Sequence, residues 1–106
     1  MRIRLPLRRL IFLGWLGLVG CGNTLYAVQA NSARDSFEEA KNLGAEQFAP
    51  YEYYGAQARI IEARSQAAHA EYGNAAALAE EADKLAKIAI EKSREARRRD
   101  REEAAR

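Results

Sequence analysis

A row of mostly apolar residues in the middle of the chain constrains the fold more than any other feature. Its members recur at alternating intervals of three and four residues, which places them on one face of an α-helix and is the spacing of a helix-packing seam. The row consists of Tyr51, Tyr54, Ala58, Ile61, Ser65, Ala68 and Tyr72. Because Pro50 suits the first position of a helix, we expect a helix from Pro50 to about Tyr72 that packs through this row.

The same spacing resumes after Gly73-Asn74, where glycine suits the end of one helix and asparagine the start of the next. The second row contains Ala75, Leu78, Ala82, Leu85, Ala89, Lys92 and Ala96, and it is widened by Ala79, Ala86 and Ile88. Two such helices joined by a short turn are expected to be antiparallel neighbours.

Apolar residues thin out after Ile90, but pairs of acidic and basic residues at i,i+4 spacing predict that the helix continues to about Ala104. These pairs are Glu80 with Lys84, Asp83 with Lys87, Glu95 with Arg99, and Arg99 with Glu103. The end of this helix is therefore expected to project beyond its neighbours into solvent.

An earlier helix is expected from Ala33 to about Phe48, where Pro50 forces it to end. Ser32 and Asp35 stand at the spacing of a capping box. The packing face of this helix contains Phe37, Ala40, Gly44 and Phe48. The glycine on this face weakens the helix.

The predicted fold is all-α: an antiparallel helical hairpin or a small three-helix bundle with a long, partly projecting C-terminal helix. Most apolar residues after position 30 are alanines. The helices must therefore approach one another closely, and the core is expected to be thin.

The first 20 residues have the three parts of a secretory signal: a basic start, an apolar stretch from Leu10 to Val19 and small residues after it. The apolar stretch is about ten residues long, whereas a membrane span needs roughly 20. Beyond the four arginines of the signal, 13 basic and 15 acidic side chains remain, so the rest of the chain is nearly neutral.

The segment Leu18-Val19-Gly20-Cys21 resembles the lipobox of bacterial lipoproteins, and it contains the only cysteine of the chain. The resemblance implies cleavage between Gly20 and Cys21, a diacylglyceryl group on the Cys21 thiol and an acyl group on the new amine. Acyl chains of this kind hold a protein on a membrane. Gly22 replaces the aspartate that retains such proteins at the inner membrane, which favours the outer membrane, facing the periplasm.

Three other interpretations of this region remain open. Cys21 can be a small buried residue of the fold. Cleavage after Ala30 would release a soluble periplasmic protein, and Leu10 to Val28 can also remain as an uncleaved span.

Four parts follow from these observations. Residues 1–20 are the signal peptide, and residues 21–31 are the lipidated N-terminus with a flexible tether, since residues 22–31 have no charge and no helical stripe. Residues 32–93 form the helical domain, and residues 94–106 form a charged, arginine-rich helical extension.

A second resemblance covers roughly residues 33–93. Gly44-Ala-Glu-Gln-Phe-Ala-Pro50-Tyr-Glu, the alanine-rich stripe and Tyr72-Gly73-Asn74 are similar to a family of small helical domains of unknown function. That family occurs in envelope lipoproteins of Gram-negative bacteria, sometimes beside a peptidoglycan-binding domain. The resemblance implies an envelope location and supplies no catalytic residues.

The chain lacks the residue patterns of an enzyme. Its single histidine, His69, has no acidic residue at a facing helical position. Adjacent glutamates diverge by about 100° on a helix, which does not pair their carboxylates for catalysis. No metal-ligand spacing or phosphate-binding loop is present in the sequence. We therefore expect no catalysis, no metal and no cofactor other than the lipid.

Four aromatic residues form a candidate contact for a partner: Phe48, Tyr51, Tyr53 and Tyr54. Aromatic faces provide large contact areas at modest entropic cost. In the competing interpretation, Tyr51 and Tyr54 pack on the first helix, and Tyr53 lies at the edge of that contact.

Four arginines near the end of the chain form a candidate contact for an anionic polymer: Arg97, Arg98, Arg99 and Arg101. The competing interpretation is a solvated helix end, where cations interact favourably with the helix dipole.

The expected function is that of a lipid-anchored envelope protein with a structural or adaptor role. Its alanine-lined helical face would bind an envelope protein or a second copy of the chain. The alternative is a module that binds peptidoglycan or another anionic envelope polymer through the basic C-terminal helix. Export by the signal argues against a nucleic-acid partner.

Overall fold

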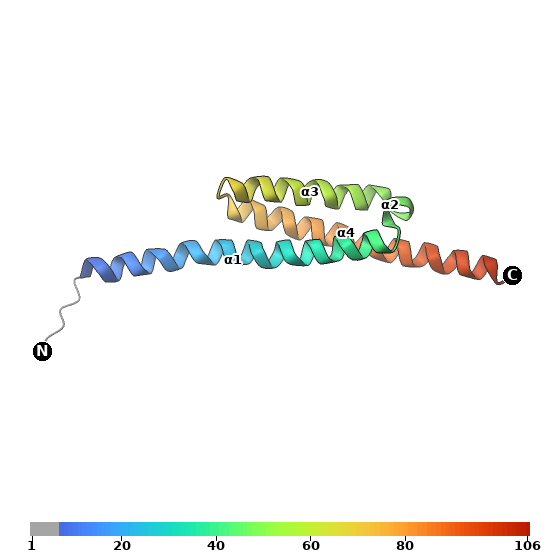
Figure 1. The fold of residues 1–106 in the computed structure, drawn as a ribbon, viewed down its shortest axis with the longest axis horizontal. Coiled ribbons are helices and arrows are strands. Elements are labelled where there is room, and N and C mark those ends of the chain that lie inside the picture. The colour runs from blue at the N-terminus through green and yellow to red at the C-terminus, as the bar shows by residue number, and fades with distance from the viewer. Residues whose placement is uncertain (1–6) are drawn as a thin grey trace, which may run out of the picture.

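The computed structural model describes the backbone of residues 7–106 and the side chains of residues 23–106. Over the described backbone the chain forms four helices and no strand: α1 (Leu7–Asn42), α2 (Ala45–Phe48), α3 (Pro50–Ala68) and α4 (Tyr72–Ala104). The predicted all-α fold is confirmed, and the end of α4 extends past the other helices (Figure 1). Among the helices described, none is both long enough and apolar enough to cross a membrane.

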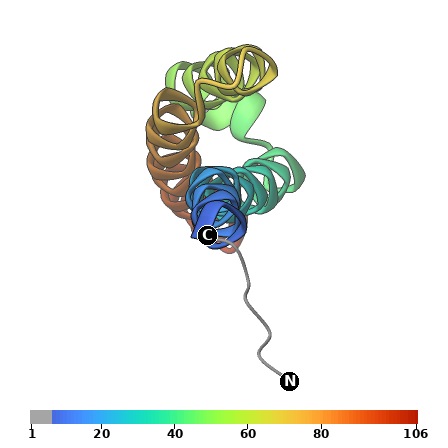
Figure 2. The same ribbon diagram turned by 90° about the vertical axis from the view of Figure 1, so that its left-hand side faces the viewer.

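The central helix of the bundle is α4. Both α1 and α3 pack along α4, and they touch each other far less than they touch it. The predicted antiparallel hairpin is formed by α3 and α4, while α1 runs beside α4 in the same direction (Figure 1). Viewed from its end, α4 is the middle of a curved layer with α3 and α1 on its two sides (Figure 2).

The core consists almost entirely of alanine, as the composition predicts. The buried alanines of α4 are Ala75, Ala76, Ala79, Ala82, Ala86 and Ala89. The largest fully enclosed side chain among those described is that of Ser93, whose hydroxyl donates to the Ala89 carbonyl oxygen at 2.7 Å. Small side chains let helices approach closely, but each one buries little apolar area.

The packing face of α3 is not the predicted one. Tyr51 and Ile61 leave 81% and 60% of their surface exposed. A second row with the same spacing is turned inward instead, and it consists of Ala49, Tyr53, Ala56, Ile60 and Ala63. The alanines of this row let α3 lie close to α4. The prediction was wrong because heptad spacing does not choose between two interleaved rows on one helix.

The first helix starts and ends earlier than predicted. Residues 22–31, expected to be a flexible tether, continue α1, because Tyr26 packs against Tyr72 of α4 with ring centroids 6.4 Å apart. Ser32 therefore lies inside α1 and does not start a helix. At the other end, Gly44 adopts a φ of +85°, which ends the helical run after Asn42 and leaves α2 as a separate turn.

The turn between α3 and α4 lies at residues 69–71 and not at Gly73-Asn74. Ala70 adopts a left-handed φ of +59°, and the Glu71 amide donates to the Gln66 carbonyl oxygen at 2.9 Å, which closes the end of α3. Left-handed backbone normally favours glycine, so an alanine gave no sign of the turn. As a consequence, Tyr72 belongs to α4.

Three of the four predicted i,i+4 pairs form on α4: Lys84 with Glu80 at 3.4 Å, Lys87 with Asp83 at 2.9 Å and Arg99 with Glu95 at 2.6 Å. Arg99 takes Glu95 as its partner and not Glu103. Ile88, expected in the buried row, leaves 43% of its surface exposed, and Ile90 is buried in the core.

Two buried carboxylates connect α4 to the outer helices. Lys92 of α4 donates to Glu52 of α3, and this contact holds the pKa of Glu52 below its usual value despite burial. The Ser36 hydroxyl of α1 donates to Asp83 of α4 at 2.6 Å. Burial raises the pKa of Asp83, but hydrogen bonds from Ser36 and Lys87 outweigh it, so the net direction is downward.

Candidate functional site: an arginine-lined hollow

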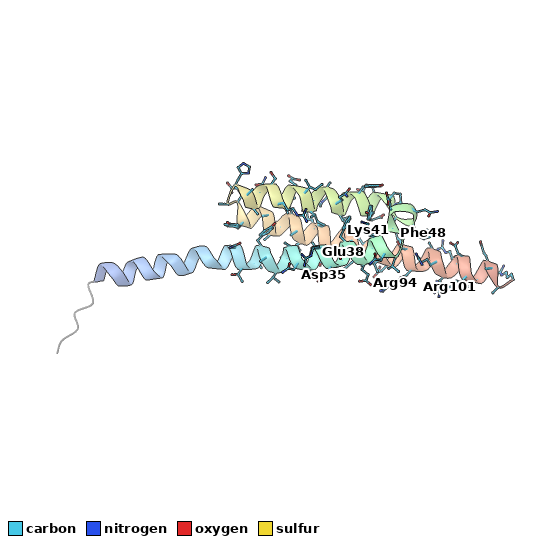
Figure 3. The ribbon with its side chains drawn as sticks, in the orientation of Figure 1. Asp35, Glu38, Lys41, Phe48, Arg94 and Arg101 are labelled. Carbon is cyan, nitrogen blue, oxygen red and sulfur yellow. The ribbon has the colours of Figure 1, made fainter. Side chains whose placement is uncertain are left out.

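A hollow of about 600 Å³ opens where the end of α1, the short α2 and the projecting part of α4 meet. Its lining residues are Leu43, Gly44, Gln47, Phe48, Arg94, Arg97, Asp100 and Arg101. Figure 3 shows Phe48, Arg94 and Arg101 at this end of the bundle, with Asp35, Glu38 and Lys41 along α1. We refer to this site as the arginine-lined hollow.

The left-handed turn at Gly44 shapes the hollow. A Cβ atom at this position would lie 3.2 Å from Cε2 of Phe48 and 3.7 Å from a terminal nitrogen of Arg97. Glycine therefore supplies the positive φ and also lets the Phe48 ring fold back over the turn. The ring forms an apolar wall beside the guanidinium groups.

Arg97 closes the C-terminal end of α1. Its Nε donates to the Leu43 carbonyl oxygen at 2.7 Å. Carbonyl groups at the end of a helix lack partners within the helix, and a cation there also interacts favourably with the helix dipole. Arg94 reaches the same helix, since its Nη2 lies 2.5 Å from Oε1 of Glu39. These two arginines therefore have structural partners as well as a place in the hollow.

Arg101 has no ion-pair partner within the described part of the chain. Asp100 is the single carboxylate among the lining residues, against three guanidinium groups. The hollow therefore has a net positive charge beside an aromatic wall. Guanidinium groups bind carboxylates and phosphates with paired hydrogen bonds, and an aromatic face packs on apolar or sugar surfaces.

The predicted polymer contact is a nearly consecutive run of arginines, and the structure separates the members of this run. Arg97 and Arg101 line the hollow, Arg99 pairs with Glu95 beside a different hollow, and Arg98 is exposed outside both. The run omitted Arg94, which does line the hollow. The spacing 94, 97, 101 is that of one helical face, so this signal was present in the sequence.

The four aromatic residues do not form one surface. Phe48 lines the hollow, whereas Tyr53 is buried, stacked on Phe37 of α1 with ring centroids 4.8 Å apart. The Tyr54 ring meets Tyr53 edge-on, and its hydroxyl donates to Oε1 of Glu46 at 2.8 Å. That hydrogen bond raises the pKa of Tyr54. Tyr51 is exposed and Tyr53 is buried, so the competing interpretation of Tyr51 packed and Tyr53 at the edge is wrong. Contact of the aromatic residues with a partner stays a prediction.

The candidate lipidation site lies outside the residues whose side chains are described. Gly20 and Cys21 are part of α1. Cleavage and lipidation at these residues stay predictions.

The fold and the site together define a class of protein: a small all-α rod in which a helical hairpin and a third helix share an alanine core, with a basic hollow near one end. Residues 28–105 match the family described as a domain of unknown function (DUF4398), and since the match covers most of the chain, the protein belongs to that family. The match includes the arginine-rich end of α4. No curated protein and no solved structure matches the chain.

Proposed function

We propose that this protein is a lipid-anchored rod of the bacterial envelope that links the outer membrane to peptidoglycan. The observation that carries the proposal is the distance between the proposed lipid anchor at Cys21 and the arginine-lined hollow. From Cys21 to Asn42, α1 covers about 30 Å at 1.5 Å per residue, and the arginine-lined hollow lies at the far end of this distance. Beyond the hollow, α4 continues in the same direction (Figure 1).

Little of the chain separates the proposed anchor from the packed bundle. Tyr26, five residues after Cys21, already contacts Tyr72 of α4. A lipid on Cys21 would therefore hold the bundle close to the membrane, and the continuous helix α1 would direct the hollow away from it. This arrangement suits a partner located at a distance from the lipid surface.

The chemistry of the hollow fits the proposed polymer. Peptidoglycan presents carboxylates close to sugar rings. Arg101 can bind a carboxylate with two parallel hydrogen bonds, and the Phe48 ring can pack on a sugar face. Most alanines of the expected adaptor face pack within the bundle, which favours the hollow as the binding surface.

Retention of the full chain on isolated cell walls tests the binding end. Arg101→Gln removes the unpaired guanidinium of the hollow, whereas Arg98→Gln removes the same charge from an exposed position outside it. We expect Arg101→Gln to lower retention about tenfold, while Arg98→Gln leaves it nearly unchanged. Equal losses for both variants would mean that only the overall charge matters, and unchanged retention of Arg101→Gln would remove the hollow from the proposal.

Labelling cells with radioactive palmitate tests the anchor. We expect label on the native chain and none on the Cys21→Ser variant, because the thiol is the acceptor of the lipid. Mass spectrometry of the mature protein distinguishes the open alternatives, because it locates the N-terminus even where the terminal amine is acylated. A mature chain that starts at Asn31, or a native chain without label, would refute the lipid anchor at Cys21.

A further inference from the structure

Two hollows between α1 and α3 form a groove. In the ribbon, α1 and α3 lie on the two sides of α4 and curve toward each other (Figure 2). The two hollows, of about 170 and 310 Å³, adjoin and share Arg34, Ile60 and Arg64 as lining residues. The apolar lining includes Ala33 and Phe37 from α1 and Ile60 from α3, and Ala79 of α4 contributes to the smaller hollow. The groove is distinct from the arginine-lined hollow.

The groove is long enough to receive several turns of a helix. Along α1 its lining extends from Tyr26 to Lys41, about 22 Å at 1.5 Å per residue. Since α1 and α3 both pack on α4 but touch each other little, the array has the geometry of a four-helix bundle without its fourth member. Ile61, on the groove edge, leaves 60% of its surface exposed.

Most of the charged residues on the rim of the groove are basic. The rim contains Arg34, Lys41 and Arg64, with Glu38 as its only carboxylate. Within the described part of the chain, Lys41 and Arg64 have no ion pair. Arg34 lies 3.9 Å from Asp35, and both of those side chains are largely exposed, so this contact contributes little. Two arginines therefore flank an apolar floor from opposite sides.

From this geometry we infer that the groove binds an amphipathic helix of a partner protein, with apolar side chains on Ile60 and Phe37 and acidic residues along both flanks. Apolar anchors in a groove supply contact area, and complementary charges on the rim select the partner. A second copy of the chain that presented its own groove would bring the same arginines face to face. The rim therefore favours an acidic partner over a second copy.

Two designed peptides of about 20 residues test this inference. Both are helical with one stripe of leucine and alanine, flanked by glutamates in one peptide and by lysines in the other. Fluorescence anisotropy measures their binding to the full chain. We expect the glutamate peptide to bind about tenfold more tightly than the lysine peptide, with an advantage that shrinks as salt is added.

Charge reversal on the rim provides the decisive variant. Arg34→Glu with Arg64→Glu is expected to reverse the preference between the two peptides. The matched control, Arg98→Glu with Arg106→Glu, reverses the same number of exposed arginines away from the groove and is expected to preserve the preference. Circular dichroism verifies that the variants remain folded, and a third variant, Lys41→Glu, provides the same test should the double variant unfold.

Three results would overturn the inference. The first is equal binding of the two peptides, or no binding of either. The second is a preference that survives charge reversal on the rim or is lost in the control. The third is self-association of the native chain, seen by sedimentation and abolished by the rim variants, because it would make a second copy the occupant of the groove.

Discussion

Replacement of Gly44 by alanine should destabilise the bundle, whereas the same replacement at Gly73 should stabilise it. At Gly44 the backbone has a φ of +85°, which costs an alanine about 1–2 kcal/mol, and the new Cβ would lie 3.2 Å from the Phe48 ring. At Gly73, in the first turn of α4, a Cβ meets nothing within 4 Å, and alanine is the better helix former by up to about 1 kcal/mol. The two variants should therefore differ by about 2–3 kcal/mol.

Urea unfolding followed by circular dichroism measures this difference. For a protein of this size the free energy of unfolding falls by about 1 kcal/mol per molar urea, so the two midpoints should be separated by roughly 2 M or more, on opposite sides of the native value. The native chain and both variants share the same charge and nearly the same volume, which makes the comparison a matched one. If both midpoints move in the same direction, the left-handed backbone at residue 44 is not the reason that this position needs glycine.

Three further substitutions test particular contacts. Ile61→Ala should change the free energy of unfolding by less than about 0.5 kcal/mol because the side chain is exposed, whereas Ala86→Leu should lower it by about 1–3 kcal/mol because no space surrounds the fully buried methyl group. If thermal melts show that Ile61→Ala destabilises the protein more than Ala86→Leu does, the row of α3 that contains Ile61 is its packing face. Ala70→Gly removes the strain of a left-handed alanine and should raise the free energy of unfolding by about 1 kcal/mol, seen as a higher melting temperature; a lower one would contradict the φ of +59°. Because the pKa values of Glu52 and Asp83 are lower in the folded than in the unfolded chain, their contribution to stability is complete above the usual Glu52 value of 4.5 and is lost as the pH falls below it. Glu52→Gln should therefore weaken the acid dependence of the urea midpoint, and an unchanged dependence would show that Lys92 does not stabilise the ionised form.

On α4 the prediction was correct for the alanines of the packing face, which are buried from Ala75 to Ala89. It was wrong for Lys92, which is exposed, and Leu78 and Leu85 of the predicted row are only partly buried. On α3 two rows share the same spacing, and the predicted row, which contains Tyr51 and Ile61, is the exposed one. The structure buries the other row, since its alanines allow the close approach that the thin core requires.

The candidate site, too, was predicted only in part from the sequence. The positive charge of the C-terminal end was evident from the arginine run, but the grouping of Arg94, Arg97 and Arg101 with Phe48 depends on contacts between residues about 50 apart in the chain. The Gly44 turn places Phe48 beside α4, and the Leu43 carbonyl oxygen fixes Arg97. Neither contact has a local sequence signature.

The sequence by itself determined that the chain is helical, that its core is made of alanine and that positive charge collects at one end. These properties depend on neighbours one or two helical turns away, so periodicity and composition report them. Only the tertiary structure decided which row of α3 is buried, where α3 gives way to α4 and which arginines lie beside Phe48. Those choices depend on how closely three helices approach one another, and the free energy of that approach is shared among residues far apart in the sequence.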